Sequence, residues 1–478
     1  MLKKNLLYNY LLAISQFIFP LVTFPYSSRI LGPEGIGSVN FIDSFTQYAI
    51  LFAALGIPLY GVREISKLKD HPEKLSKTFS EIFLIHICSA LLFSLIYLIA
   101  AHFVPALKNH YDLVWVGIAI VVSGVLSAEW LFQGLEQFAY VTIRTLLVRC
   151  LSVLLLFIFL KPASDPIVYY LLLASGGILN GLVNVYYLRK LVKIRFNNLD
   201  LKRHMRPLMV ILGSTLAVSV YVLMDTVILG FLKGDKAVGI YATALRVVRL
   251  PLAMVAAVTA VIVPGVSRAF EQKDFEGIRL LIHKSFSLIC LIGFPVAMGL
   301  YVSADFLIHL FAGDQFAEAS LPLKIMSAMV LLNGMASILF LQLLAPLGKE
   351  KYLLKSYFIG MLFSISSNIL LIHFYSYTGA AIGIMLTEGL TTALAYYFLT
   401  KTFKISFDRK IMLQCLIGAL FFFPIAILLK HLPFNTVINE LSVIVTCILF
   451  YACYISLYIK NPYVQAFKQS ILIKFSRS

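Results

Sequence analysis

Two arginines interrupt a long apolar run near the middle of the chain. Arg246 and Arg249 lie three residues apart in a stretch, 241–266, that otherwise has the composition of a membrane-spanning helix. If the span starts near residue 238, a rise of 1.5 Å per residue puts the two side chains roughly 12 and 16 Å inside it. A charge at that depth costs at least ~2.5–3.5 kcal/mol on insertion scales, so it needs a polar cavity or a partner. We expect the pair to line a cavity, and structural pairing with carboxylates is the alternative.

Polar side chains form a stripe along another predicted helix. Asn40, Asp43, Ser44 and Gln47 have the spacing i, i+3, i+4 and i+7, which places them on one face. Glu388 is also deep in an apolar run. Because such groups are expensive in hydrocarbon, we expect Asn40, Asp43, Gln47 and Glu388 to face the same cavity or a partner.

A charge pair is predicted between Arg29 and Asp225. The two residues lie in helices that correspond to each other in an internal repeat, and they differ there by only two positions. They should therefore lie at similar depth, where opposite charges can offset the cost of leaving water. Arg29 is close to a helix end, so its side chain could instead extend to the membrane surface.

A second charged cluster lies in the stretch EWLFQGLEQFAYVTIRTLLVRC. Glu129, Gln133 and Glu136 have helical spacing on one face, and Arg144 and Arg149 follow in the next predicted span. The connection between the two spans is predicted to be cytoplasmic, which puts the cluster at the inner mouth of the protein. A clasp between two helices is the favoured interpretation, and a gate that opens and closes is the alternative.

The elements that must position these residues are membrane-spanning helices. Of the 478 residues, 60% are hydrophobic and only 13% are charged, a composition that a soluble domain could not bury. Apolar runs of about 20 residues, enough to cross ~30 Å of hydrocarbon, recur from end to end. The sequence therefore predicts an all-α polytopic membrane protein with about fourteen transmembrane helices. The predicted spans are 6–30, 36–61, 79–104, 113–135, 139–160, 167–188, 208–231, 238–266, 280–303, 321–347, 354–374, 379–400, 411–430 and 437–459.

The spans fall into two halves that share a motif. Ile30–Leu31–Gly32 matches Ile228–Leu229–Gly230, and Gly37 matches Gly239. The separation of about 200 residues equals six spans, and an even number of spans gives both copies the same orientation. We predict two six-helix bundles in parallel repeat around a central cavity, followed by two further helices and a cytoplasmic tail. These parts cover 1–200, 201–405 and 406–478.

Lys and Arg concentrate on one side of the membrane. The even-numbered connections and the C-terminal tail carry most of them, as in RKLVKIRFNNLDLKRHMR. By the positive-inside rule, these connections and both termini are cytoplasmic. The net charge of +17 therefore suits anionic membrane lipids, and no basic folded domain for nucleic acid is present. The six cysteines and the histidines lack metal-ligand spacing and no Walker A motif occurs, so we expect no metal, cofactor or ATPase activity.

Three stretches carry a family resemblance: FPYSSRILGPEGIGSVNFIDSFTQYAILFAALGIPLYGVREISKLKD, EWLFQGLEQFAYVTIRTLLVRCLSVLLLFIFLK and MDTVILGFLKGDKAVGIYATALRVVRLP. The sequence resembles the bacterial Wzx-type (O-antigen) polysaccharide flippases of the multidrug/oligosaccharidyl-lipid/polysaccharide exporter superfamily. The resemblance implies a MATE-like fold and alternating access in the bacterial inner membrane. It also implies a transporter, not an enzyme, which works with other polysaccharide assembly proteins.

The substrate that the resemblance implies is a polyprenyl-pyrophosphate-linked oligosaccharide, moved from the cytoplasmic to the outer leaflet. Its pyrophosphate is polyanionic, and paired guanidinium groups can bind phosphate oxygens in a two-pronged way. Arg29, Arg246 and Arg249 are therefore candidates for a cationic lumen.

Two other functions remain open at this point. A cation-coupled antiporter of the same superfamily would need an acidic cavity, which Asp43, Asp225 and Glu388 could provide as coupling groups, although the arginines count against it. A membrane polymerase or ligase would be expected to have a large external loop with basic residues. The longest predicted external loop, ADFLIHLFAGDQFAEAS, has no Lys or Arg.

Overall fold

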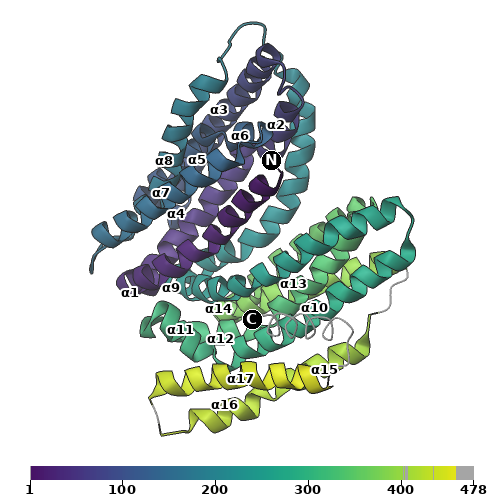
Figure 1. Cartoon of the computed structure of the whole chain (residues 1–478). Coiled ribbons are helices and arrows are strands. Elements are labelled where there is room, and N and C mark those ends of the chain that lie inside the picture. The colour runs from purple at the N-terminus through teal and green to yellow at the C-terminus, as the bar shows by residue number, and fades with distance from the viewer. Residues whose placement is uncertain (1, 402, 404–406, 434, 459–478) are drawn as a thin grey trace. The chain divides into compact units, whose positions relative to one another are not determined.

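The computed structural model describes residues 2–401, 403, 407–433 and 435–458, and every regular element in these ranges is a helix (Figure 1). Ten of the described helices are long and apolar enough to cross a membrane, or up to eleven if the bent pair Asp314–Met326 and Met329–Leu344 is one span. The prediction of an all-α, multi-pass membrane protein is thus confirmed.

The chain divides into two compact units, Met1–Ala242 and Thr243–Ser478. The first contains eight helices and the beginning of a ninth that continues into the second unit. Their bounds are α1 Leu2–Ala54, α2 Ile57–Ser66, α3 Pro72–Phe103, α4 Pro105–Lys108, α5 Tyr111–Ser127, α6 Glu129–Gly134, α7 Phe138–Phe159, α8 Pro166–Leu191 and α9 Lys202–Glu271. Within this unit, α1 packs on α3, α5 and α7, α5 packs along α8, and α2 packs on α6.

The second unit contains the rest of α9 and the C-terminal helices. Their bounds are α10 Phe275–Val302, α11 Ala304–Ala312, the 3₁₀-helix η1 Asp314–Ala319, α12 Ser320–Met326, α13 Met329–Ser337, the π-helix η2 Ile338–Leu344, α14 Glu350–Thr400, α15 Arg409–Leu420, α16 Phe422–Lys430 and α17 Thr436–Tyr458. Here α10 packs on α13 and α15, and α16 lies beside α17 (Figure 1). The predicted domain boundaries near 200 and 405 stay predictions.

Three long helices each consist of two arms joined at a break. The breaks are at Gly32 in α1 (φ 65°, ψ −177°), at Gly234 in α9 (φ 77°, ψ −175°) and at Ser376 in α14 (φ 52°, ψ −134°). Positive φ suits glycine because it has no Cβ, so the first two breaks fall where the sequence permits them. With each arm counted as a span, the described helices are compatible with fourteen spans, and that number stays a prediction.

Two predicted spans contain a turn that hydropathy did not indicate. In the predicted span 36–61, α1 ends at Ala54, and Leu55 (φ 49°) and Gly56 (φ 78°) turn the chain before α2 begins. The predicted span 113–135 is interrupted at Ala128 (φ 40°), between α5 and the short α6. Apolar composition continues through both turns, so hydropathy alone could not locate them.

The breaks also correct the register of the repeat. Gly32 and Gly234 have nearly the same backbone angles, so Gly32 corresponds to Gly234 and not to Gly230. The match of Gly37 with Gly239 agrees with this spacing. In the corrected register Asp225 corresponds to Thr23, six residues before Arg29, which is roughly 9 Å along a helix. The argument that Arg29 and Asp225 lie at equal depth is therefore wrong.

The two glycine breaks lie against each other within the first unit. A Cβ on Gly37 would lie 1.8 Å from the carbonyl oxygen of Asp235, and a Cβ on Gly239 would lie 1.9 Å from the carbonyl oxygen of Pro33. Real Cβ atoms never come so close to backbone, so each position must be glycine. The contact is reciprocal, because each glycine touches the turn of the other copy.

Candidate functional site

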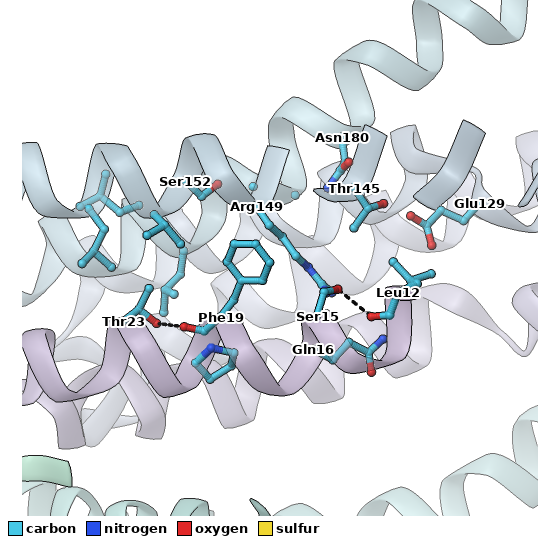
Figure 2. Close-up of a pocket in the computed structure, with 17 residues that line it drawn as sticks. Leu12, Ser15, Gln16, Phe19, Thr23, Glu129, Thr145, Arg149, Ser152 and Asn180 are labelled. Carbon is cyan, nitrogen blue, oxygen red and sulfur yellow. Dashed lines mark hydrogen bonds between the residues drawn. The ribbon is translucent and has the colours of Figure 1, made fainter. Parts of the chain in front are cut away.

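A cavity of about 500 Å³ lies within the first unit, between α1, α7 and α8 and beside the start of α6 (Figure 2). We call it the inner pocket. Its lining combines apolar side chains with two charged and several neutral polar groups. The lining residues are Leu12, Ser15, Gln16, Phe19, Pro20, Thr23, Glu129, Thr145, Arg149, Ser152, Val153, Leu156, Leu172, Leu173, Gly176, Gly177 and Asn180.

Arg149 supplies the positive charge of the inner pocket. It comes from α7 and reaches toward α1, where its Nη1 donates a hydrogen bond to the Ser15 hydroxyl. The guanidinium carbon lies 6.0 Å from the centre of the Phe19 ring, within the range of a cation–π contact. The side chain is half-buried. A guanidinium has five N–H groups. Arg149 donates one of them to a neutral hydroxyl and contacts one ring, so most of its N–H groups can bind a ligand.

Two further polar atoms of the pocket wall have no hydrogen-bond partner among the described residues. They are the Ser152 hydroxyl on α7 and Oδ1 of Asn180 on α8. A buried polar group without a hydrogen-bond partner lowers stability by about 1–3 kcal/mol, so such groups usually bind water or a ligand. Gly176 and Gly177 on α8 add no side chain to the space beside them. The pocket can therefore bind a ligand that has both a negative charge and hydroxyl or amide groups.

Arg144 lies one and a half turns before Arg149 but has a different environment. It is only 5% exposed, and its Nη2 pairs with Glu129 Oε1 at 2.6 Å. It also donates to Asn184 and to the Thr145 hydroxyl. The ion pair joins α6 to α7 and neutralises the one carboxylate among the described lining residues. The arrangement of Glu129 and Arg144 has the form of a clasp.

Glu136 and Gln133 do not share this cluster as predicted. Helix α6 ends at Gly134, and Glu136 follows it with φ 59°, so no continuous helix face joins residues 129 and 136. The Glu136 carboxylate pairs with Lys69 at 3.0 Å. Gln133 is half-buried and does not line the inner pocket. The cluster therefore consists of Glu129, Arg144 and Arg149.

The polar stripe on the second arm of α1 is tied into the first unit. The Tyr170 hydroxyl donates to Asp43 Oδ1 at 3.1 Å, and Gln47 Nε2 donates to Asp43 Oδ2 at 3.5 Å. Asn40 donates to the carbonyl of Ile36 within its own helix, at 2.7 Å. Asp43 is the centre of the stripe, with α8 holding one of its oxygens.

Asp225 and Arg29 each form hydrogen bonds with residues near them in the sequence. Asp225 is 2% exposed and accepts hydrogen bonds from the Tyr241 hydroxyl and from the Thr226 N–H. Arg29 is exposed and donates to the carbonyl of Pro25 at 2.8 Å. The proposed pair between them stays a prediction, without the support of equal depth.

The remaining candidates lie in the second unit. Arg249 is exposed and Arg246 is partly exposed on α9. Glu388 on α14 is 8% exposed and close enough to Tyr357 to interact electrostatically. Their roles in a central cavity stay predictions.

The neutral members of the inner pocket were not predicted from the sequence. Ser15, Phe19, Ser152 and Asn180 are ordinary residues of apolar helices, and single Ser or Asn residues in spans are common. They form a site only because α1, α7 and α8 bring them together around one cavity. Only the charges of Arg149 and Glu129 indicated this site from the sequence.

Comparison with known proteins places the chain in a family. The family described as "Polysaccharide biosynthesis protein" matches residues 2–270, and the family MatE matches residues 211–370. A protein named "Putative O-antigen transporter" from Escherichia coli K12 is 27% identical over 405 residues, which cover 83% of this chain and 96% of that protein. The "Probable low-salt glycan biosynthesis flippase Agl15" of Haloferax volcanii is 26% identical over 200 residues, 42% of each chain.

Solved structures share the fold at low identity. The lipid II flippase MurJ in an inward closed conformation has a TM-score of 0.75 at 13% identity, covering 95% of this chain and all of that one. An inward-facing multidrug resistance MATE transporter has a TM-score of 0.64 at 15% identity, covering 81% of this chain and 96% of that one. Because the first family matches more than half of the sequence, the chain belongs to the polysaccharide biosynthesis protein family.

Proposed function

We propose that this protein is a flippase that moves a polyprenyl-pyrophosphate-linked oligosaccharide from the cytoplasmic to the outer leaflet of the bacterial inner membrane. Alternating access would expose the substrate site first to one side and then to the other, and the glycan would serve cell-surface polysaccharide synthesis. The observation that carries the proposal is a cationic, hydroxyl-rich pocket within the spans of a polysaccharide biosynthesis family member. The function is transport and involves no bond-making step.

The lining of the inner pocket fits the chemistry of such a substrate. Arg149 can bind phosphate oxygens through a planar two-pronged donor pair, and attraction of opposite charges is strong where water is scarce. Ser152 and Asn180 can hydrogen-bond sugar hydroxyl or acetamido groups, and the Phe19 ring can stack on a sugar face. The Arg144–Glu129 pair supports this, because it removes the charge that would repel an anion.

Other charged residues extend the proposed path. Arg246, Arg249 and Arg29 are proposed as further cations that hold the pyrophosphate during transport. Asp43 and Asp225 are proposed as groups that bind the coupling cation, since both are carboxylates held by tyrosine hydroxyls inside spans. We also propose that both termini are cytoplasmic and that other polysaccharide assembly proteins act with this chain.

A second candidate function has one observation in its favour. The MatE match over residues 211–370 includes Asp225, a buried carboxylate that could drive a cation-coupled drug antiporter. Such a protein would export small cations and would lose activity when Asp225 is neutralised. It would not require Arg149.

The decisive experiment is deletion of the gene in its own host, followed by rescue. We expect lipid-linked oligosaccharide to accumulate on the cytoplasmic side and surface glycan to disappear. The wild-type gene should restore surface glycan, and Arg149→Ala should not, although its abundance in the membrane stays normal. Unchanged surface glycan in the deletion strain, together with increased drug sensitivity, would favour the antiporter.

A further inference from the structure

A second cavity lies at one end of the first unit, where α2 ends, α3 begins and α9 begins. It has a volume of about 420 Å³, and its lining includes four basic side chains, Lys67, Lys74, Lys77 and Arg203. We call it the helix-end pocket. The inner pocket shares no lining residue with it. The helix-end pocket is therefore a separate site.

The floor of this pocket is a network of buried polar groups. The Tyr60 hydroxyl lies 2.7 Å from His204 Nδ1, and His204 Nε2 lies 3.0 Å from Glu81 Oε2. Glu81 is fully buried and His204 is 2% exposed. The same carboxylate pairs with Arg203 and accepts the Asp200 N–H at 2.8 Å. A network satisfied on this scale holds the Arg203 guanidinium in one orientation at the cavity wall.

The charges around the opening leave a positive excess. Lys67 pairs with Glu64 at 2.7 Å, and Arg63 approaches the same carboxylate at 3.4 Å, so the negative charge of Glu64 is fully compensated. Lys74 and Lys77, one turn apart at the start of α3, then add two further charges. A concave site with a fixed guanidinium and two lysines attracts a compact anion with several acceptor oxygens.

We propose that the helix-end pocket binds the phosphate group of a membrane lipid at the surface of the bilayer. Arg203 Nε and Nη2 already donate to His204, Thr78 and Glu81, so Arg203 would bind a phosphate oxygen chiefly through Nη1. Lys74 and Lys77 would bind the other oxygens as point charges. Two sources have this chemistry: the headgroup of an anionic glycerophospholipid and the pyrophosphate of the lipid-linked glycan before it enters the transport path. Only the second source rests on the proposed function.

The test is direct binding to the purified full-length protein, with no transport step. Native mass spectrometry would count phosphatidylglycerol molecules bound to the detergent-solubilised protein. We expect Lys74→Ala/Lys77→Ala to lower the apparent affinity by about tenfold or more, since each basic residue near a surface contributes on the order of 1 kcal/mol. The matched control is Lys190→Ala/Lys193→Ala, which removes two exposed lysines near the same end but outside the lining.

A third variant should increase lipid binding at this site. Glu64→Gln removes the negative charge at the opening, so it should increase phosphatidylglycerol binding without relying on loss of structure. Competition with inorganic pyrophosphate then separates the sources. Displacement at millimolar concentration or below indicates a site for the pyrophosphate of the carrier lipid, and resistance to it indicates a glycerophospholipid site. Equal losses in the pocket and control variants, with no gain in Glu64→Gln, would overturn the proposal.

Discussion

The two pockets of the first unit carry positive charge in different surroundings. They have similar volumes, about 500 and 420 Å³. The inner pocket has one half-buried guanidinium among neutral polar groups. The helix-end pocket gathers four basic side chains, of which Lys67, Lys74 and Arg203 are exposed and Lys77 is half-buried. Attraction between charges grows as the surroundings become less polar, so one buried cation can equal several exposed ones. Burial, and not the number of positive charges, should therefore distinguish a transport site from a surface docking site.

The largest effect should follow removal of Arg149, the half-buried cation of the inner pocket. Arg149→Ala is expected to reduce glycan export at least tenfold, because hydrogen bonds to a charged group contribute roughly 1.5–3 kcal/mol. Arg149→Lys should restore only part of the rate, since an ammonium keeps the charge but loses the planar fork. Export would be measured as surface glycan at matched protein abundance. Wild-type export by Arg149→Ala would contradict the assignment of the inner pocket.

Removing Arg144, which pairs with Glu129, should affect stability and not export. Arg144→Ala leaves the Glu129 carboxylate without its ion-pair partner and removes one of the hydrogen bonds of Asn184. It should cost roughly 3 kcal/mol of folding free energy, with less protein in the membrane. The measurement is the thermal unfolding midpoint in detergent. Glu129→Gln/Arg144→Gln should be milder than Arg144→Ala, because it leaves no uncompensated charge. An unchanged midpoint with lost export would make Arg144 a substrate ligand and remove the contrast with Arg149.

The functions of the two pockets should differ in how strongly they depend on salt concentration. Between roughly 0.05 and 0.5 M salt the screening length falls several-fold, and exposed charges lose most of their attraction. Phosphatidylglycerol binding that depends on Lys74 and Lys77 should therefore fall steeply. The part of the export rate in proteoliposomes that depends on Arg149 should change by less than about twofold. Equal salt dependence of both would erase the distinction between them.

The smallest effect is expected at an ion pair outside both pockets. Lys324 Nζ lies 2.8 Å from Asp305 Oδ2 in the second unit, and both side chains are partly exposed. Burial tends to raise the pKa of the Asp305 carboxyl, but the hydrogen bond and charge of Lys324 outweigh it and hold the pKa below the usual value. A lowered pKa means that the pair stabilises the fold above the ordinary aspartate pKa and loses this contribution as the pH falls below it.

Asp305→Asn should accordingly lower the unfolding midpoint slightly at neutral pH, and this difference should shrink as the pH falls through the lowered pKa of Asp305. The expected cost is below about 1 kcal/mol, which is typical of exposed ion pairs. The comparison is with wild-type protein melted at the same pH values. A larger loss than that of Arg144→Ala would contradict the idea that burial decides the effect of a charge.

The class of fold was predictable from the sequence because hydropathy and length suffice for helices that span lipid. The turns at Leu55 and Ala128 were not, since apolar residues continue through them and only backbone angles mark the interruption. The repeat was found, but a match of three letters, Ile-Leu-Gly, set its register four residues away from the true one. The break at Gly234 shows that backbone conformation was the reliable guide.

The candidate site was predictable only through its charges. Arg149 and Glu129 stood out because charged residues are rare in spans. Ser152 and Asn180 did not, because their importance depends on lacking a partner in a space that three helices enclose. Glu136 was assigned to the wrong neighbours because a helical spacing was extended past Gly134, where the helix ends.

The reciprocal contact of Gly37 and Gly239 makes the two helix breaks depend on each other. Gly37 lies against the carbonyl of Asp235, and Gly239 lies against the carbonyl of Pro33. Pro33 and Asp235 correspond to each other in the corrected register, so the two contacts are equivalent. Residue i contacting j′ while i′ contacts j is the signature of an isologous interface, the kind that forms between identical subunits related by a two-fold axis. The two break motifs therefore pack with local two-fold symmetry inside the first unit, and a side chain added at either glycine would push both turns apart.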